Sequence, residues 1–293
     1  MKTLKTLVIA VALAAGTTGL THAATSVAAT QSTVKVQQIR NATAKIDYAG
    51  KTFLVDPFLA KKGTYPGFPD TFHSELRNPT VELPLPVKDI MNGVDAVIVT
   101  HTHLDHWDGG DQNFIPKAIP LFVQHEADAK LIRGQGYTNV RIMTDSTEFE
   151  GVHLTKTGGR HGTEEMYSNK PLGDALGEAM GVVFEAPGAK TVYIVGDTVW
   201  NSTVDSTLSK FKPDVIILNT GEARMRGYTG AIIMGKDDVL HAWQVMPNAT
   251  IIATHMDAIN HMTLSRKELR DHVNEHKIGD RVLIPADGEV MKF

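Results

Sequence analysis

The stretch VIVTHTHLDHWDGG, residues 97–110, places three histidines and two aspartates directly after an apolar run. The residues VDAVIVT (94–100) are almost continuously apolar, which is typical of a strand buried on both faces. Ligands in α/β folds gather where such strands end. The stretch therefore predicts a metal site at the end of a buried strand, rather than a solvated polar loop.

The spacing within the motif predicts two neighbouring metal ions. His101 and His103 are two residues apart in extended chain, so their side chains can point the same way and share one cation. Asp105 and His106 follow after the chain turns and can reach a second cation beside the first. Since a catalytic zinc has about three protein ligands and an open position, further ligands must come from later in the chain.

Three later strand ends offer those ligands. His161 lies in TGGRHGTEE, Asp197 in YIVGDT and His255 in IIATHMDA. The glycine before Asp197 allows close backbone approach, and a carboxylate there could bridge two cations. Each residue taken alone also fits a structural role in a turn, but their succession after the first motif favours ligands.

The rest of the chain alternates strands and helices from about residue 34. Each half begins with a hairpin and continues with β-α units, which predicts two β-sheets flanked by helices in a single domain, 34–293. Strands are expected within 33–40, 43–57, 94–100, 139–143, 152–159, 180–197, 213–221, 249–255 and 281–285, and helices within 125–136, 237–246 and 265–276.

The first 23 residues have the pattern of a secretory signal. Lys2 and Lys5 precede a short apolar run, and Thr21-His22-Ala23 forms a small-residue cleavage site. The run is too short to span a bilayer, so we expect a periplasmic or secreted protein without stable membrane insertion after cleavage. Residues 24–33 are expected to form a disordered leader.

Composition narrows the chemistry. The 293 residues include no cysteine, so a metal site must use nitrogen and oxygen ligands. The net charge of −4, without blocks of Lys or Arg, disfavours a nucleic-acid surface and favours a small-molecule substrate.

One long segment, residues 56–87, fits neither a helix nor a strand. It carries six of the 13 prolines of the chain. Long loops inside a domain are usually lids, binding loops or disordered segments, and we expect a lid here. His73 within it is a candidate substrate contact.

The order H-x-H-x-D-H, His161, Asp197 in GDT and His255 resembles the metallo-β-lactamase superfamily, over essentially the whole mature chain. The resemblance implies an αββα four-layer sandwich with two mixed β-sheets flanked by helices. It assigns His101, His103 and His161 to one metal, and Asp105, His106 and His255 to the other, with Asp197 bridging.

Two further stretches, FLVDPF (53–58) and GRHG (159–162), look like the branch of ascorbate-phosphate lactonase and N-acyl-phosphatidylethanolamine phospholipase D. One departure is visible. Many members have glycine two residues after the last histidine of the motif, but here Trp107 and Asp108 precede Gly109. The cysteine ligand of one group of true β-lactamases is absent, which disfavours antibiotic hydrolysis. The basic RNA-binding features of the processing nucleases are absent as well, which disfavours RNA processing.

These observations predict an exported dinuclear zinc hydrolase that uses a metal-bridging hydroxide on a lactone, ester, amide or phosphodiester. The ligands also accept Mn²⁺ or Fe. Asp105 could orient the hydroxide, and His261 could donate a proton to the leaving group. Asp56, at a strand end, could support a ligand or simply form a turn.

The loop NTGEARMRGYTG (219–230) also follows a strand end. Glu222, Arg224 and Tyr228 are its candidate substrate contacts, and a solvated loop is the alternative. Two other functions stay open: an iron-dependent redox enzyme on the same fold, and a metal-bearing binding protein without catalysis.

Overall fold

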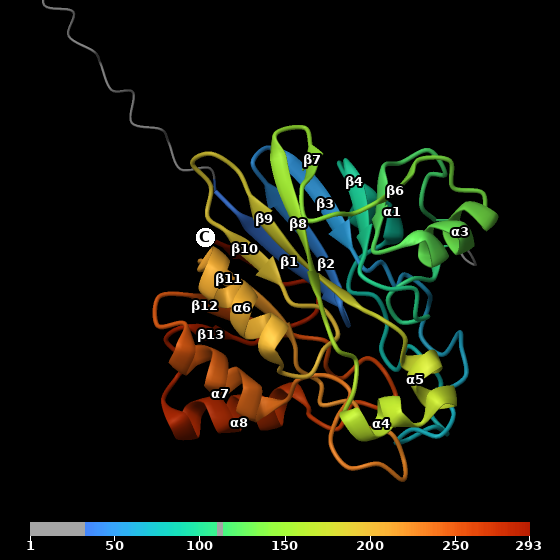
Figure 1. Cartoon of the computed structure of the whole chain (residues 1–293), viewed down its shortest axis with the longest axis vertical. Helices are drawn as coiled ribbons and strands as arrows, with labels where there is room; N and C mark the ends of the chain where they lie inside the picture. The colour runs from blue at the N-terminus through green and yellow to red at the C-terminus, as the bar shows by residue number, and fades with distance from the viewer. Residues whose placement is uncertain (1–32, 110–113) are drawn as a thin grey trace, which may run out of the picture. The chain divides into compact units, whose positions relative to one another are not determined.

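Two seven-stranded mixed β-sheets form the centre of the fold in this computed structural model, which describes residues 33–109 and 114–293 (Figure 1). The first sheet has the order β14-β1-β2-β3-β4-β5-β6 and the second the order β13-β12-β11-β10-β9-β8-β7. The strands are β1 Lys35–Arg40, β2 Thr43–Tyr48, β3 Lys51–Val55, β4 Ala96–Val99, β5 Leu121–Val123, β6 Val140–Ile142, β7 Thr147–Phe149, β8 Val152–Gly158, β9 Met180–Glu185, β10 Val192–Ile194, β11 Val215–Asn219, β12 Thr250–Thr254, β13 Val282–Leu283 and β14 Val290–Lys292.

Strand direction is organised in the same way in both sheets. In the first, β1, β2 and β3 are antiparallel and β3 to β6 are parallel. In the second, β7 to β10 are antiparallel and β10 to β13 are parallel. The sheets meet where β4 ends, since the Met180 amide donates to the Thr100 carbonyl over 3.2 Å. Strand ends from both sheets therefore lie at one edge.

Aromatic rings fill the space between the sheets. Phe53 of β3 packs edge-on against Phe184 of β9, with ring centroids 5.3 Å apart, and against Phe149 of β7 at 5.7 Å. All three rings belong to one buried cluster that draws on both sheets. Such offset aromatic packing stabilises the contact beyond the apolar area it buries.

Helices cover the outer face of each sheet. The helices are α1 Val87–Met91, α3 Glu126–Gly134, α4 Glu164–Ser168, α5 Lys170–Leu176, α6 Ser202–Phe211, α7 Lys236–Val245 and α8 Arg266–His276. Leu208, Val239 and Leu269, from α6, α7 and α8, pack on the second sheet. Ile90 of α1 and Ile132 of α3 pack on the first. The layers confirm the expected αββα sandwich.

Most expected elements are present, but several were not anticipated: α1, α4, α5, α6, β5, β7 and β14. Helix α6 shows why. Its serines and threonines have low helix propensity, so the pattern gives little warning. The helix nevertheless begins where the Asn201 side chain accepts the Thr203 amide over 2.8 Å, and it buries Val204 and Leu208.

The segment 56–86 contains no helix or strand, as expected for residues before α1. It is nevertheless tied to the body of the protein at several points. Phe58, Leu59 and Ala60 are buried, and Tyr65 pairs with Asn78 in an isolated bridge. Movement of this segment as a lid stays a prediction.

The signal segment 1–23 and the leader up to residue 32 lie outside the described residues, and the division of the chain into signal, leader and one domain stays a prediction. Within the described part, no helix combines the length and apolar character needed to cross a bilayer.

Candidate metal centre

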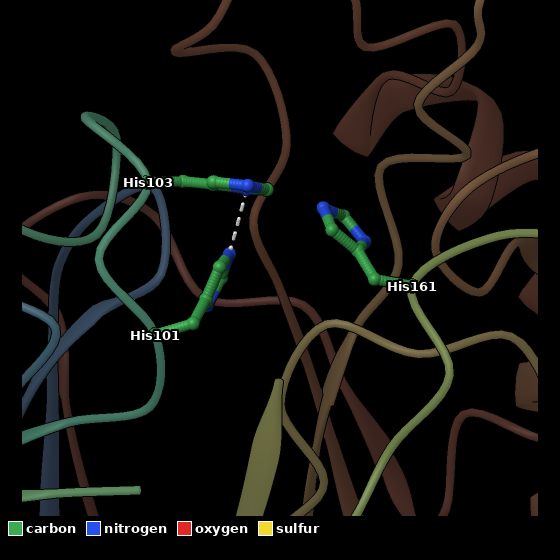
Figure 2. A group of neighbouring side chains, drawn as sticks. All are labelled: His101, His103 and His161. Carbon is green, nitrogen blue, oxygen red and sulfur yellow. Dashed lines mark hydrogen bonds between the residues drawn. The ribbon is translucent and has the colours of Figure 1, made fainter. Parts of the chain in front are cut away.

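All seven predicted ligand residues come together at the shared edge of the two sheets. The loop after β4 contributes His101, His103, Asp105 and His106, and the segment after β8 contributes His161 from the opposite side (Figure 2). Asp197 follows β10 and His255 follows β12, so both sheets contribute to one buried cluster. Their donor atoms form three groups, in each of which the atoms lie within 4.8 Å of one another: His101, His103 and His161; His101, His106 and Asp197; Asp105, His106 and His255.

The three histidines of the first group are held so that one nitrogen of each faces the centre. His101 Nε2 lies 3.0 Å from His103 Nδ1 (Figure 2). The other nitrogen of His103, Nε2, donates to the Ala175 carbonyl over 2.9 Å, and His161 Nδ1 donates to the Ile232 carbonyl over 3.0 Å. These outer bonds select the tautomer that leaves a lone pair towards the centre, as is usual for metal-binding histidines.

The group of Asp105, His106 and His255 is buried more deeply than the group of His101, His103 and His161. His106 Nε2 lies 3.0 Å from His255 Nε2, and Asp105 Oδ2 lies 3.5 Å from the same His255 nitrogen. Both histidines are fully buried. Two imidazole nitrogens at this distance cannot both accept, so a proton or a cation must lie between their lone pairs.

Asp197 lies between the group of His101, His103 and His161 and the group of Asp105, His106 and His255. Its Oδ2 lies 3.2 Å from His106 Nε2, 3.6 Å from His255 Nε2 and 3.7 Å from His161 Nε2. The preceding Gly196 has φ +75°, and a Cβ there would lie 2.4 Å from the Met180 carbonyl oxygen. Glycine is therefore required for the approach that brings the carboxylate between the groups.

Asp56 contacts a predicted ligand directly. Its Oδ2 accepts from His106 Nδ1 over 2.9 Å, and Thr100 donates to the same carboxylate through its amide and its hydroxyl, both over 2.7 Å. This geometry keeps the proton on Nδ1 of His106 and leaves Nε2 for a cation. The structure thus places Asp56 where the supporting role requires it.

The electrostatics of the cluster fit divalent metal ions. Burial alone would lower the pKa of His106, but Asp197, Asp56 and Asp105 outweigh it and raise the pKa well above its usual value. By contrast, burial and the neighbouring His106 and His103 hold the pKa of His101 well below its usual value, and burial lowers that of His161 to about 4. Neutral imidazoles beside buried carboxylates are the donor set of zinc and related metals.

A cavity of about 310 Å³ opens onto this centre. Its floor is formed by the predicted ligands His103, Asp105, His161 and Asp197 together with His261. Its walls are mostly apolar and come from three segments distant in sequence: Phe68, Pro69 and Thr71; Leu172, Ala175 and Leu176; Met225 and Ile232. The cavity has the size and apolar lining of a small-molecule site.

His261, the predicted proton donor, is buried in the floor of this cavity and packs edge-on against Phe68, with ring centroids 5.1 Å apart. Burial lowers its pKa to about 4. The ring is therefore neutral near pH 7 and can donate only through its single N–H, which makes it a hydrogen-bond donor rather than an imidazolium acid.

The four predicted substrate contacts do not line this cavity as the described residues form it. His73 is exposed and lines a separate hollow beside Phe72 and Leu76. Glu222 and Arg224 pair with each other over 2.5 Å, and the Tyr228 hydroxyl accepts from an asparagine amide. Their loop instead contributes Met225 and Ile232 to the wall, because the direction of a loop side chain does not follow from its polarity.

The sequence pattern did not single out several residues that shape the centre. Asn219, the last residue of β11, donates to Asp197 Oδ1 over 2.6 Å. A polar residue ending an apolar strand was the available signal. No sequence signal pointed to the Ala175 carbonyl or to the side chains of Leu172 and Leu176, because α5 was not expected.

A family model for the beta-lactamase superfamily domain matches residues 51–256. The UPF0173 protein YddR of Bacillus subtilis is 44% identical over 260 residues, which cover 89% of this chain and 100% of that protein. A UPF0173 metal-dependent hydrolase of Methanocaldococcus jannaschii, MJ1163, is 24% identical over 71% of this chain and 88% of its own length.

Two solved structures are more similar still in sequence. A possible metal-dependent hydrolase from Veillonella parvula is 50% identical, with a TM-score of 0.87, and the match covers 89% of this chain and 99% of the other. An isothiocyanate hydrolase from Delia radicum gut bacteria is 50% identical, with a TM-score of 0.85 and coverage of 88% and 99%.

Proposed function

Because this chain belongs to the β-lactamase superfamily and is a metal-dependent hydrolase, we propose that it is an exported dinuclear zinc enzyme that hydrolyses isothiocyanates with a small apolar substituent. The shared edge of the two sheets, with seven nitrogen and oxygen ligands, supports the dinuclear site. The branch of ascorbate-phosphate lactonase and the phospholipase remains a prediction, as does the redox alternative with iron. Because the relatives are metal-dependent hydrolases, the alternative of a metal-bearing binding protein without catalysis has no support.

The observation that carries the substrate class is the lining of the cavity. None of its lining residues in the described chain is a lysine or an arginine. A phosphodiester or carboxylate in this cavity would place those of its charged oxygens that do not reach the floor against Phe68, Leu172 and Met225, at a desolvation cost. A neutral substrate with an apolar substituent loses no such hydration. Among the classes predicted from sequence, the phosphodiester is therefore disfavoured.

The similar protein from Delia radicum gut bacteria is an isothiocyanate hydrolase. An isothiocyanate is a neutral electrophile, and it fits this apolar lining. In the hydrolysis of R–N=C=S, water oxygen bonds to the central carbon while a proton goes to nitrogen. The resulting thiocarbamic acid transfers its hydroxyl proton to nitrogen, the C–N bond breaks, and an amine and carbonyl sulfide leave. The reaction consumes only water, so it needs no oxidant or further cofactor.

The residues at the floor would divide this work. The chemistry supplied by two bound divalent ions would be polarisation of the substrate and a water with its pKa lowered to about 7. His101, His103 and His161 would hold one ion, Asp105, His106 and His255 the other, and Asp197 would contact both. Asp105 would also orient the attacking water. His261 would donate a hydrogen bond from its ring N–H to the departing nitrogen. Phe68 and the opposite apolar wall would exclude bulk water.

Turnover of benzyl isothiocyanate tests the proposal. We expect the purified zinc protein to release benzylamine and carbonyl sulfide, with kcat/KM at least about a hundredfold above that for bis(p-nitrophenyl) phosphate, because the larger diester would leave polar oxygens away from the floor, buried without partners against the apolar walls. Gas and amine analysis follow the products, and a neutral lactone and a β-lactam reporter serve as comparison substrates. A preference for the phosphodiester or the lactone would contradict the proposal, and iron with no hydrolysis of any reporter would favour the redox alternative.

Export is proposed from the first 23 residues. Cleavage after Ala23 removes Lys2 and Lys5 and leaves a mature chain that begins at Ala24. We expect N-terminal sequencing of protein recovered from the periplasm or the medium to start at that residue. Recovery of the uncleaved chain from the cytosol would show that the segment is not a signal.

A further inference from the structure

Asp108 stands where many members of the superfamily have glycine, and its buried carboxylate joins the metal-binding loop to the segment 56–86. Asp108 Oδ1 accepts the Leu59 amide over 2.9 Å, and Oδ2 accepts the amides of Leu59 and Ala60 over 3.0 and 2.7 Å. Hydrogen bonds to a buried charged acceptor are among the stronger ones in proteins. The carboxylate therefore anchors the start of this segment.

A buried arginine holds the same turn from the other side. Arg40 Nη2 donates to the carbonyls of Phe58 and Ala60 over 2.7 and 2.9 Å, and Nη1 donates to the Val81 carbonyl over 3.1 Å. Burial lowers the pKa of Arg40 to about 10, and nearby carboxylates led by Asp108 oppose that effect, so the guanidinium stays charged at neutral pH. The turn 58–60 thus lies between an anion and a cation.

Apolar contacts carry this anchoring to the cavity. Phe58 and Ala60 pack in one small cluster with Tyr65 and Phe68, and the rings of Phe58 and Tyr65 stack with centroids 6.1 Å apart. Phe68 then forms part of the cavity wall, together with Pro69 and Thr71. A shift of the turn 58–60 would therefore move the Phe68 wall, whereas the predicted metal ligands lie on other segments of the chain.

We propose that Asp108 is a positioning residue that sets substrate selectivity by holding the Phe68 wall of the cavity against the substituent of the substrate. The choice of isothiocyanates as its readout rests on the function proposed above, whereas the anchoring itself does not. Trp107, the neighbouring departure from the family pattern, has a separate packing role: its ring nitrogen donates to Gln135 Oε1 over 2.7 Å.

Asp108→Asn tests this role. The asparagine keeps one accepting oxygen and presents an NH₂ group to an amide of the turn, so at least one hydrogen bond to a charged acceptor is lost. We expect KM for benzyl isothiocyanate to rise about tenfold, and KM for methyl isothiocyanate, whose substituent buries little of the wall, to change less than about twofold. Metal content and kcat for both substrates are expected to stay as in the wild type.

Asp95→Asn is the matched control, because Asp95 Oδ2 also accepts a backbone amide, that of Thr52 over 2.8 Å, but before β4 begins, at the strand end opposite the metal loop. It should lower stability without changing the ratio of the two KM values. Hydrogen exchange adds a readout without turnover: the Leu59 and Ala60 amides should exchange faster in Asp108→Asn only.

The outcomes separate the two proposals. If wild-type protein hydrolyses neither isothiocyanate, the proposed function fails, and the exchange of Leu59 and Ala60 still decides the anchoring. An unchanged ratio of KM values in an active Asp108→Asn variant would overturn the selectivity role. Equal loss of kcat for both substrates together with loss of metal would also overturn it, because Asp108 would then act through the metal ligands.

Discussion

Asp197→Asn is expected to lower kcat/KM by at least about 10³-fold and to reduce bound zinc from two equivalents to one or fewer, since even the loss of a ligand's hydrogen-bond partner costs about 10–100-fold. The reason lies in the two oxygens of this carboxylate. Oδ1 accepts from Asn219 over 2.6 Å, so the remaining amide oxygen would stay there. The new NH₂ group would then face His106 and His161. Both predicted metal sites would therefore lose the anionic oxygen that Asp197 offers them. Metal analysis and steady-state kinetics measure both effects.

Asp56→Asn provides the graded comparison for that variant. It leaves every predicted ligand in place and alters only the hydrogen bond from His106 Nδ1, 2.9 Å long. Zinc affinity should fall about 10–100-fold, with two equivalents still bound at saturating zinc. If Asp197→Asn binds two equivalents and remains as active as Asp56→Asn, Asp197 is not shared between the two ions.

The clustering of the predicted ligands could be anticipated from the sequence because they lie in the segments that follow strands. His101, Asp197 and His255 all come within two residues of the end of an apolar run, and parallel strands end at the same edge of a sheet. Strand periodicity and strand ends are local signals. The two sheets flanked by helices follow from the same regularity, repeated in both halves of the chain, whereas the αββα layering was implied by the resemblance to the superfamily.

The cavity walls could not be anticipated, because their signal is tertiary. Phe68, Leu172 and Met225 lie more than 50 residues apart, and each alone fits an ordinary core position. Polar loop residues such as His73 and Glu222 are suggested by their chemistry, but side-chain direction in an irregular segment depends on contacts with distant backbone. Polarity in a loop is therefore weak evidence for substrate contact.

Asp108 illustrates the same limit within the strongest motif. In the sequence it was an unexplained departure from a family pattern. Its partners, the amides of Leu59 and Ala60, lie 49 and 48 residues earlier in the chain. A backbone amide carries no mark in the sequence, so only the folded chain shows that this carboxylate belongs to the wall of the site as well as to the metal loop.

Removal of the metals with EDTA should abolish hydrolysis and lower the melting temperature by about 10 °C or more. Binding at a thousandfold excess over Kd stabilises a folded protein by about 4 kcal/mol per site, and about 1 kcal/mol shifts the melting temperature of a domain of this size by roughly 2–4 °C. The cause is the buried negative charge of Asp56, Asp105 and Asp197, which surround His106. Without a metal ion, a proton on His106 is the nearest positive charge that can balance these three carboxylates. Calorimetry before and after chelation measures the shift.

Reconstitution identifies which metal the chemistry needs. Zinc added back should restore both the melting temperature and the hydrolysis of benzyl isothiocyanate, and Mn²⁺ or Fe²⁺ may be compared at equal occupancy. Asp197→Asn serves as the control, because a variant that holds one ion or none should show a correspondingly smaller response to EDTA. An undiminished melting temperature in wild-type protein shown to be free of metal would contradict the electrostatic account, since the buried carboxylates would then be stable without a cation. Activity restored by iron alone would instead favour the redox alternative on the same ligands.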